Sequence, residues 1–294
     1  MLVTPSRIVA ATDFSDDAAN AVRRAAMLAR RHGTELELLH VISRSSLDAV
    51  REWVREPADC ADRLVEDTRR ILEEAAPSTG TPTSARLVLG EVLEEISSSC
   101  APGRILVAGA RGLNPLRDAI IGTTAERLVG RCECPILVVR KSPQEDYRKV
   151  LVAVDLLPGS ENALAAALAI APGAPMAAVH AFDVPFEGAL QRAGVALREI
   201  DRYRAAAFGK ALEAVRSLSG AAAGDPNLFL PIVDRGHAAR LILKHEHDLG
   251  AELVVIGKRS RSTAEALILG STTRHVLADA GCDVLVVPLA PQAA

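Results

Sequence analysis

The chain repeats its own order of motifs after about 140 residues, and this duplication constrains the fold more than any other feature. An aspartate that ends an apolar run occurs at Asp13 and again at Asp155, 142 positions later. A glycine that ends a later apolar run occurs at Gly109 and again at Gly257, 148 positions later. The small difference between these spacings is what short loop insertions produce, so the chain contains two copies of one structural unit.

The length of 294 residues is sufficient for two domains of ordinary size. We place the first domain at residues 1–141 and the second at residues 149–290, with the polar segment SPQEDYR as a linker between them. Each half alternates short apolar runs with helical patterns in the order β-α-β-α-β-α-β-α-β. This order predicts an α/β fold in which each half is a doubly wound parallel sheet with right-handed crossovers.

Local signals place several helices. Ser15 is predicted as an N-cap, two aspartates follow it in the first turn, and Gly33 ends the helix. A long helical region is predicted at 46–76, interrupted by Pro57, and another at 187–218.

A glycine-rich motif between two strand-like runs is the main candidate for binding chemistry. It reads Gly109-x2-Gly112-x9-Gly122-Thr123-Thr124. Glycine after a strand allows the backbone to approach a ligand closely and to adopt a positive φ. The free amides at the predicted helix start, with two hydroxyl groups beside them, form a candidate anion site.

This spacing resembles the nucleotide-binding signature of the universal stress protein family, and the resemblance covers almost the whole chain twice. It implies two tandem five-stranded sheets of strand order 3-2-1-4-5, in the adenine-nucleotide alpha-hydrolase-like class. The expected ligand is ATP with Mg²⁺. By this resemblance Asp13 and Val41 border adenine and ribose, while the motif residues cradle phosphates; these are Gly109, Gly112, Gly122, Thr123 and Thr124. Arg111 and Arg117 are candidates for additional positive charge.

The second half departs from the motif at one position, because Ser260 stands where the first half has Gly112. A side chain there would be costly if the position needs a positive φ, so we expect weaker binding or a purely structural role. Lys258 and Arg259 are expected to offset part of the loss electrostatically. The candidate residues retained in this half are Asp155, Gly257, Gly270, Ser271 and Thr272.

The resemblance also implies a dimer-like arrangement within one chain. The apolar runs Ile136–Val139 and Val284–Val287 are expected at sheet edges, which proteins normally pair or cover. We predict that they face each other across a pseudo-twofold axis, so that one chain mimics the family's usual dimer. A homodimer of whole chains and an unidentified protein partner remain open.

Composition narrows the function classes. A net charge of −3 gives no broad attraction to nucleic acid, and the low aromatic content of 3% provides no base-stacking platform. No signal peptide or membrane span is predicted, so a cytoplasmic location is expected. The five cysteines form no CxxC pair and are expected to be reduced. His245 and His247 are two residues apart, and residues at this spacing do not share a helix face. No metal site is therefore expected.

Two function classes remain. No nucleophile and base occur at a recognisable spacing, so no catalytic residue is assigned and the protein is not expected to be an enzyme. The leading hypothesis is a stress-response protein whose first repeat binds ATP, with occupancy regulating conformation or partner binding. The alternative is an interaction or dimerisation module that binds no nucleotide.

Overall fold

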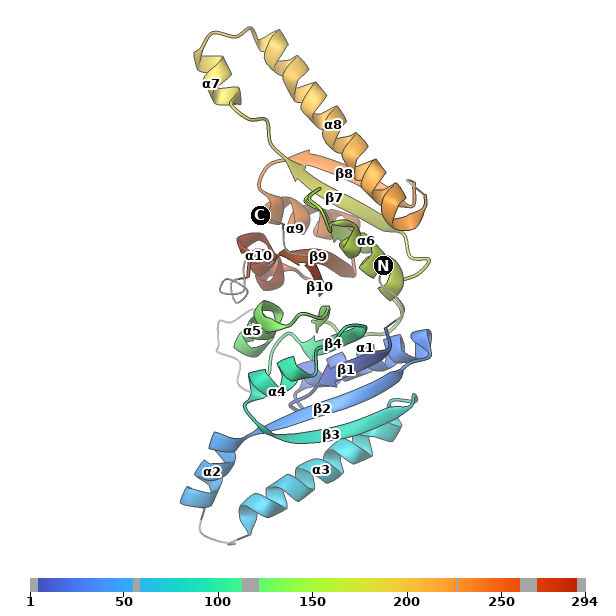
Figure 1. Cartoon of the computed structure of the whole chain (residues 1–294), viewed down its shortest axis with the longest axis vertical. Coiled ribbons are helices and arrows are strands. Elements are labelled where there is room, and N and C mark those ends of the chain that lie inside the picture. Colours follow the sequence, from blue (N-terminus) through green and yellow to red (C-terminus); the bar gives the residue numbers. More distant parts are fainter. Residues whose placement is uncertain (1–4, 55–58, 113–121, 226, 260–268, 290–294) are drawn as a thin grey trace.

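Ten strands form one continuous sheet in the computed structural model, which describes residues 5–54, 59–112, 122–225, 227–259 and 269–289 (Figure 1). The order across the sheet is β3-β2-β1-β4-β5-β10-β9-β6-β7-β8. The strands are β1 Arg7–Ala11, β2 Glu35–Ser43, β3 Thr83–Gly90, β4 Arg104–Gly109, β5 Ile136–Val139, β6 Val150–Ala153, β7 Met176–Phe182, β8 Phe229–Arg235, β9 Leu253–Arg259 and β10 Asp283–Leu289.

Each half of the sheet has the predicted order 3-2-1-4-5, and all pairs within a half are parallel. The two halves join through β5 and β10, which pair antiparallel with Leu285 opposite Leu137. The predicted pairing of these edges across a pseudo-twofold axis is therefore confirmed. Because the edges hydrogen-bond directly, the two predicted sheets are one sheet of ten strands.

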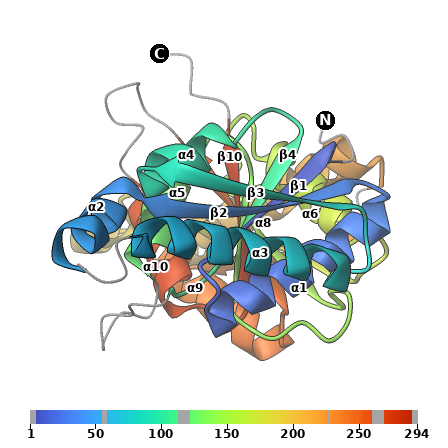
Figure 2. The same ribbon diagram turned by 90° about the horizontal axis from the view of Figure 1, so that it is seen from below.

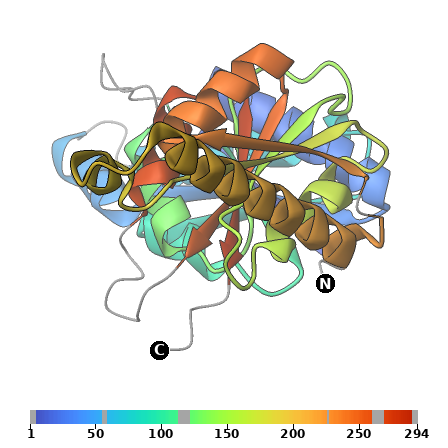
Figure 3. The same cartoon turned by 90° about the horizontal axis from the view of Figure 1, so that it is seen from above.

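Helices cover both faces of this sheet. In the first half α1 and α3 lie on one face and α4 and α5 on the other (Figure 2). In the second half α8 runs along β7 and β8 (Figure 3), packs against α6, and lies opposite α9 and α10. The helices are α1 Asp16–His32, α2 Arg44–Trp53, α3 Cys60–Ser78, α4 Val92–Ser98, α5 Thr123–Arg131, α6 Glu161–Ile170, α7 Glu187–Arg192, α8 Leu197–Ala223, α9 Ala238–Leu249 and α10 Ser271–Asp279.

The central strands are buried on both faces, which explains why they read as continuous apolar runs in the sequence. All four residues of β5 are buried, and Leu137 and Leu285 belong to one hydrophobic cluster that also contains Ile8 and Leu253. This cluster extends through both halves, so the repeats share a core across their junction.

The ends of α1 follow the sequence signals. The Ser15 hydroxyl accepts a hydrogen bond from the Ala18 amide, and Asp16 and Asp17 lie in the first turn. Gly33 adopts a left-handed conformation with φ 61°, as a helix C-cap requires. The predicted N-cap and helix stop are both confirmed.

The predicted helix at 187–218 is wrong in its continuity. The structure has two helices, α7 and α8, and Gly194 between them has φ 77°, which a helix interior does not accommodate. The region at 46–76 forms α2 and α3, and Pro57 lies outside the described residues.

The polar segment after Lys141 is more than a linker, because Tyr147 within it is only 5% exposed. Its hydroxyl donates to Asp283 Oδ2 at 2.7 Å, and the Arg24 guanidinium lies 3.9 Å from the ring centroid. Burial, together with the adjacent Asp283 carboxylate, raises the pKa of Tyr147 well above its ordinary value. Through Tyr147 the segment thus contacts Arg24 of the first half and Asp283 of the second. The Arg140 amide donates to the other Asp283 oxygen at 2.8 Å.

Candidate functional site

Each half contains a cavity where its strand order reverses, the place at which open α/β sheets bind ligands. The first cavity has a volume of about 490 Å³ and lies beyond the carboxyl ends of β1 and β4. The second has a volume of about 590 Å³ and lies beyond β6 and β9. Both volumes fall within the range typical of small-molecule sites.

The first cavity brings together the predicted residues from separate segments. Asp13 comes from the end of β1, Val41 from β2, Gly109 and Gly112 from the end of β4, and Gly122 from the start of α5. Thr124 also lines the cavity. Thr123 begins α5, but its side chain lies outside the described residues.

The sequence interpretation missed a second wall of this cavity. His40 and Ser43 at the end of β2, Ser46 in α2, and Val92 and Ile96 in α4 also line it. These residues lie at the carboxyl end of β2 or follow β2 and β3 in the chain. That position was the available signal, because carboxyl ends of parallel strands meet at one edge of the sheet.

Glycine is required in the first cavity because neighbouring atoms approach its backbone closely, and not because the backbone has a positive φ. A Cβ on Gly109 would lie 2.7 Å from the carbonyl carbon of Asp17 and 2.9 Å from the Ala18 amide nitrogen. A Cβ on Gly112 would lie 2.6 Å from Asp13 Oδ2. Neither glycine has a positive φ, so the condition under which a side chain at the position of Gly112 would carry a backbone penalty is not met.

Local hydrogen bonds hold Asp13 and His40 in place at the wall of the first cavity. Asp13 Oδ1 accepts from the Ser15 amide at 3.1 Å and from the Ser15 hydroxyl at 2.6 Å. His40 Nδ1 lies 2.7 Å from the Thr12 carbonyl oxygen, and the His40 ring is 4.6 Å from that of Phe14. Burial lowers the pKa of His40, which favours the neutral imidazole.

Arg111 lines the first cavity and is bound there by an acidic residue of α1. Its backbone amide and its Nε both donate to Asp17 Oδ2, at 3.1 and 3.2 Å. The guanidinium thus neutralises an acidic residue of the first turn of α1. Arg117, the other predicted cation, lies outside the described residues.

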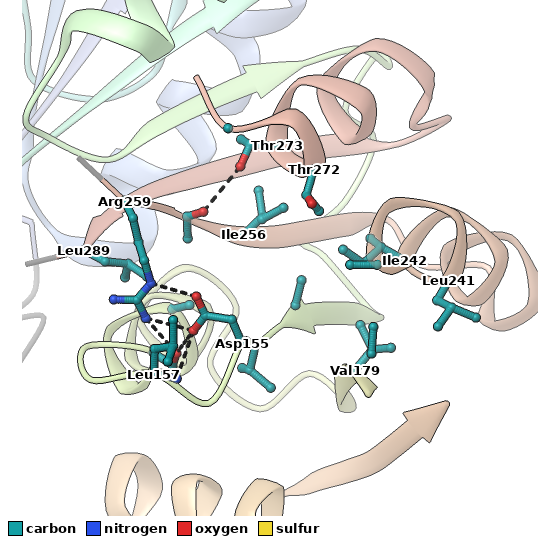
Figure 4. Close-up of a pocket in the computed structure, with 18 of the residues that line it drawn as sticks. Asp155, Leu157, Val179, Leu241, Ile242, Ile256, Arg259, Thr272, Thr273 and Leu289 are labelled. Carbon is teal, nitrogen blue, oxygen red and sulfur yellow. Dashed lines mark hydrogen bonds and ion pairs between the residues drawn. The ribbon is translucent and has the colours of Figure 1, made fainter. Parts of the chain in front are cut away.

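The second cavity has the same frame (Figure 4). The retained candidates Asp155, Gly257, Gly270, Ser271 and Thr272 all line it. The side chains of its walls include Val179, Leu241, Ile242, Ile256 and Leu289. Ser260, on which the expected weakness of this half rested, lies outside the described residues.

Asp155 in the second cavity is bound by an arginine. Arg259 Nε donates to Asp155 Oδ2 at 2.7 Å and Nη2 donates to Oδ1 at 2.8 Å, while Nη1 donates to the Pro158 carbonyl at 2.7 Å. Burial alone would raise the pKa of Asp155, but hydrogen bonds from Arg259 and Ser160 outweigh it, and the pKa lies below its ordinary value. Arg259 occupies the position of Arg111, since both lie two residues after the strand-ending glycine.

Lys258 does not face the second cavity, so its expected contribution of charge there is wrong. Its Nζ is turned into the first half and donates to carbonyl oxygens at the end of α5 and just beyond it. Side chains alternate along a strand, and β9 continues through Arg259. Lys258 and Arg259 therefore point to opposite faces of the sheet.

The glycines of the second cavity are under different constraints. A Cβ on Gly257 would lie 2.3 Å from Leu289 Cδ1, which is a side-chain contact, and nothing lies within 4 Å of a Cβ on Gly270. In the first half the corresponding neighbours of Gly109 are backbone atoms of α1. The second half therefore tolerates side chains at this edge more easily than the first.

Neither a metal cluster nor a membrane span is found among the described residues. Within those residues, no group of three or more His, Cys, Asp or Glu side chains is placed to hold a metal ion. No helix in the described part of the chain combines the length and apolarity needed to cross a membrane. The cysteines are free thiols, and burial raises the pKa of Cys282, so its thiolate is disfavoured.

The fold and the two cavities define the class of protein. It is a tandem α/β protein in which each doubly wound half has a cavity where its strand order reverses. The model of the universal stress protein family matches residues 5–140 and again residues 146–288. The chain belongs to the universal stress protein family.

Relatives match the chain over nearly its full length, and a solved structure shares its fold. A universal stress protein of Mycolicibacterium smegmatis is 26% identical over 95% of this chain and 96% of its own length. The Mycobacterium tuberculosis universal stress protein Rv2623 is 25% identical, covering 95% of each chain. The crystal structure of a universal stress protein from Archaeoglobus fulgidus covers 97% of this chain and 99% of its own, with a TM-score of 0.71 at 17% identity, and so shows the same fold.

Proposed function

We propose that this protein binds ATP in the cavity of its first half, in the cytoplasm, and that occupancy regulates its conformation or its choice of partner. The observation that supports this most strongly is the convergence of Asp13, Val41, Gly109, Gly112 and Gly122 on one cavity. These residues come from four segments spread over more than a hundred positions, yet they match the set that the family signature implies.

The residues present fit such a ligand. A Cβ on Gly109 would collide with backbone atoms of α1. At the start of α5 the Gly122 amide donates to the Ala110 carbonyl at 2.7 Å, so the amides that follow Gly122 are the ones offered to a ligand. Amides at a helix start favour phosphate. Mg²⁺ would arrive bound to the phosphates, because the described acidic side chains form no cage for it.

The geometry supports binding without a dedicated reaction. No described His or carboxylate in the first cavity shows the paired acid–base geometry that a hydrolase needs, since Asp13 is committed to Ser15 and His40 to Thr12. The second cavity is proposed as a weaker site formed by Asp155, Gly257, Gly270, Ser271 and Thr272. The alternative is a module that binds no nucleotide and acts through its surfaces, and the intact first cavity favours nucleotide binding over it.

Two measurements test the proposal. Mass spectrometry of the supernatant of denatured protein should identify a retained adenine nucleotide. Added ATP with Mg²⁺ should raise the melting temperature, since a ligand at a hundredfold excess over its Kd stabilises the folded state by about 2.7 kcal/mol. Phosphate release should stay near background. Absence of any thermal shift at millimolar ATP, or turnover at roughly one per second or faster, would overturn the proposal.

A further inference from the structure

Two cations cross from one half of the molecule to the end of a helix in the other. Lys258 in β9 donates from Nζ to the carbonyl oxygens of Val129, Gly130 and Cys132, at 2.8, 2.6 and 3.1 Å, and thus caps the end of α5. Arg140, directly after β5, donates from Nη2 to the carbonyls of Leu277 and Ala278 in α10. Each half therefore neutralises a helix C-terminus of its neighbour.

The two crossing contacts are not copies of each other. The residue in the first half that corresponds to Lys258 is Ala110, directly after Gly109, and it is 2% exposed. The residue that corresponds to Arg140 is Pro288, 148 positions later. Each half supplies its cation from a position where the other half has an apolar residue. A homodimer of identical subunits cannot divide the contacts in this way.

Lys258 makes the fuller of the two contacts. An ammonium group has three donors, and here all three have backbone acceptors in a site where Lys258 is 8% exposed. The last carbonyls of a helix have no partner within the helix, so these acceptors would otherwise be buried without a donor. The contact therefore fixes the position of the C-terminal end of α5.

The same short helix forms one wall of the first cavity. Gly122 at its N-cap and Thr124, Ala125 and Leu128 within it all line that cavity. The helix has only nine residues, so a shift of its C-terminal end is transmitted to its N-terminal amides. On the other side, Gly257 and Arg259 flank Lys258 in the chain and line the second cavity. One strand segment thus lines the second cavity and contacts the helix that forms a wall of the first.

We propose that Lys258 is a positioning residue of the nucleotide site in the first half, although it belongs to the second half. It binds the C-terminal end of α5, so that the amides at the start of the helix stay at phosphate-binding distance. The inference rests on the proposed function. It adds that the affinity of the first site is set from the second repeat, and that a ligand displacing Gly257 or Arg259 in the second cavity changes this affinity through Lys258.

The test is calorimetric titration of ATP with Mg²⁺ into the full-length wild type and into Lys258→Met and Lys258→Arg. Loss of the cation should weaken ATP binding at the first site by about twofold to thirtyfold, the range found for residues that modulate coupling between sites. Arginine keeps the charge and should restore most of the affinity. Lys258→Gln, which keeps two donors without charge, serves if the methionine variant does not fold.

Lys149→Met is the matched control. Lys149 Nζ donates to the carbonyl of Leu249, at 3.0 Å, at the end of α9, a helix that does not line the first cavity. Its loss should leave ATP affinity at the first site unchanged. If folded Lys258→Met or Lys258→Gln binds ATP as tightly as the wild type, Lys258 only stabilises the fold and the inference is wrong. If the wild type itself binds no ATP, the proposed function fails, and the inference fails with it.

Discussion

The guanidinium of Arg259 binds both carboxylate oxygens of Asp155, from Nε at 2.7 Å and from Nη2 at 2.8 Å. In the first half the equivalent Arg111 binds Asp17 instead, and Asp13 accepts hydrogen bonds from Ser15. The equivalent arginines of the two cavities therefore bind different aspartates. A ligand that needs the Asp155 carboxylate must compete with a charged contact that engages both carboxylate oxygens.

Removing this arginine should strengthen the second site. In Arg259→Gln the Asp155 carboxylate loses its charged partner, and we expect ATP affinity at the second site to rise by about tenfold, which corresponds to about 1.4 kcal/mol. Titration calorimetry measures this as a second binding event. Arg111→Gln is the control and should leave the second event unchanged. Weaker binding in Arg259→Gln would mean that Arg259 contacts the phosphates and does not compete with them.

The same ion pair predicts how stability depends on pH. The pKa of Asp155 is lower in the folded protein than its ordinary value of 3.8, so the folded state holds the carboxylate ionised more strongly than the unfolded state does. The stability it contributes is present above that ordinary value and is lost as the pH falls through the folded pKa. Urea midpoints measured at acidic pH should therefore fall less steeply in Asp155→Asn than in the wild type. Parallel curves would contradict this assignment.

The buried contact at the junction of the halves predicts a measurable loss of stability. Tyr147→Phe removes the hydroxyl that donates to Asp283, a carboxylate that is 2% exposed. We expect the free energy of unfolding to fall by about 1–3 kcal/mol, the cost of leaving a buried polar group without one of its partners. Urea denaturation gives this value. Tyr203→Phe alters a tyrosine that is 38% exposed and should change stability little; equal effects would refute a special role for Tyr147.

The sequence predicted the features that follow from local pattern and burial. Leu137 and Leu285 lie in short apolar runs, and a short apolar run at a sheet edge must be covered, so their pairing across the pseudo-twofold axis could be predicted. Ser15 and Gly33 act through hydrogen bonds and backbone geometry within one helix, so their roles as caps were also predictable.

Features that depend on contacts between the halves could not be predicted in this way. Tyr147 lies in a polar stretch that reads as a linker, and only its contact with Asp283, 136 positions away, explains its burial. Lys258 lies beside Arg259 in the sequence, and charge alone suggested the same role for both. The alternation of side chains along a strand separates them, but the length of β9 had to be known first.

The position of the first cavity could be predicted from the sequence, but the physical reason for its glycines could not. The motif placed Gly109 and Gly112 correctly beside Asp13. The cause is the approach of α1 to Gly109 and of the Asp13 carboxylate to Gly112, which are long-range contacts that spacing does not reveal.

The central claim, that the first cavity is the tighter ATP site, is tested most directly by filling each cavity in turn. Val41 and Ala181 follow the equivalent histidines His40 and His180, and each lines the cavity of its own half. Calorimetric titration of ATP with Mg²⁺ into Val41→Trp should show loss of the tight binding event, because the indole occupies the space beside Asp13. The same titration into Ala181→Trp should retain that event. Retention in Val41→Trp together with loss in Ala181→Trp would contradict the account.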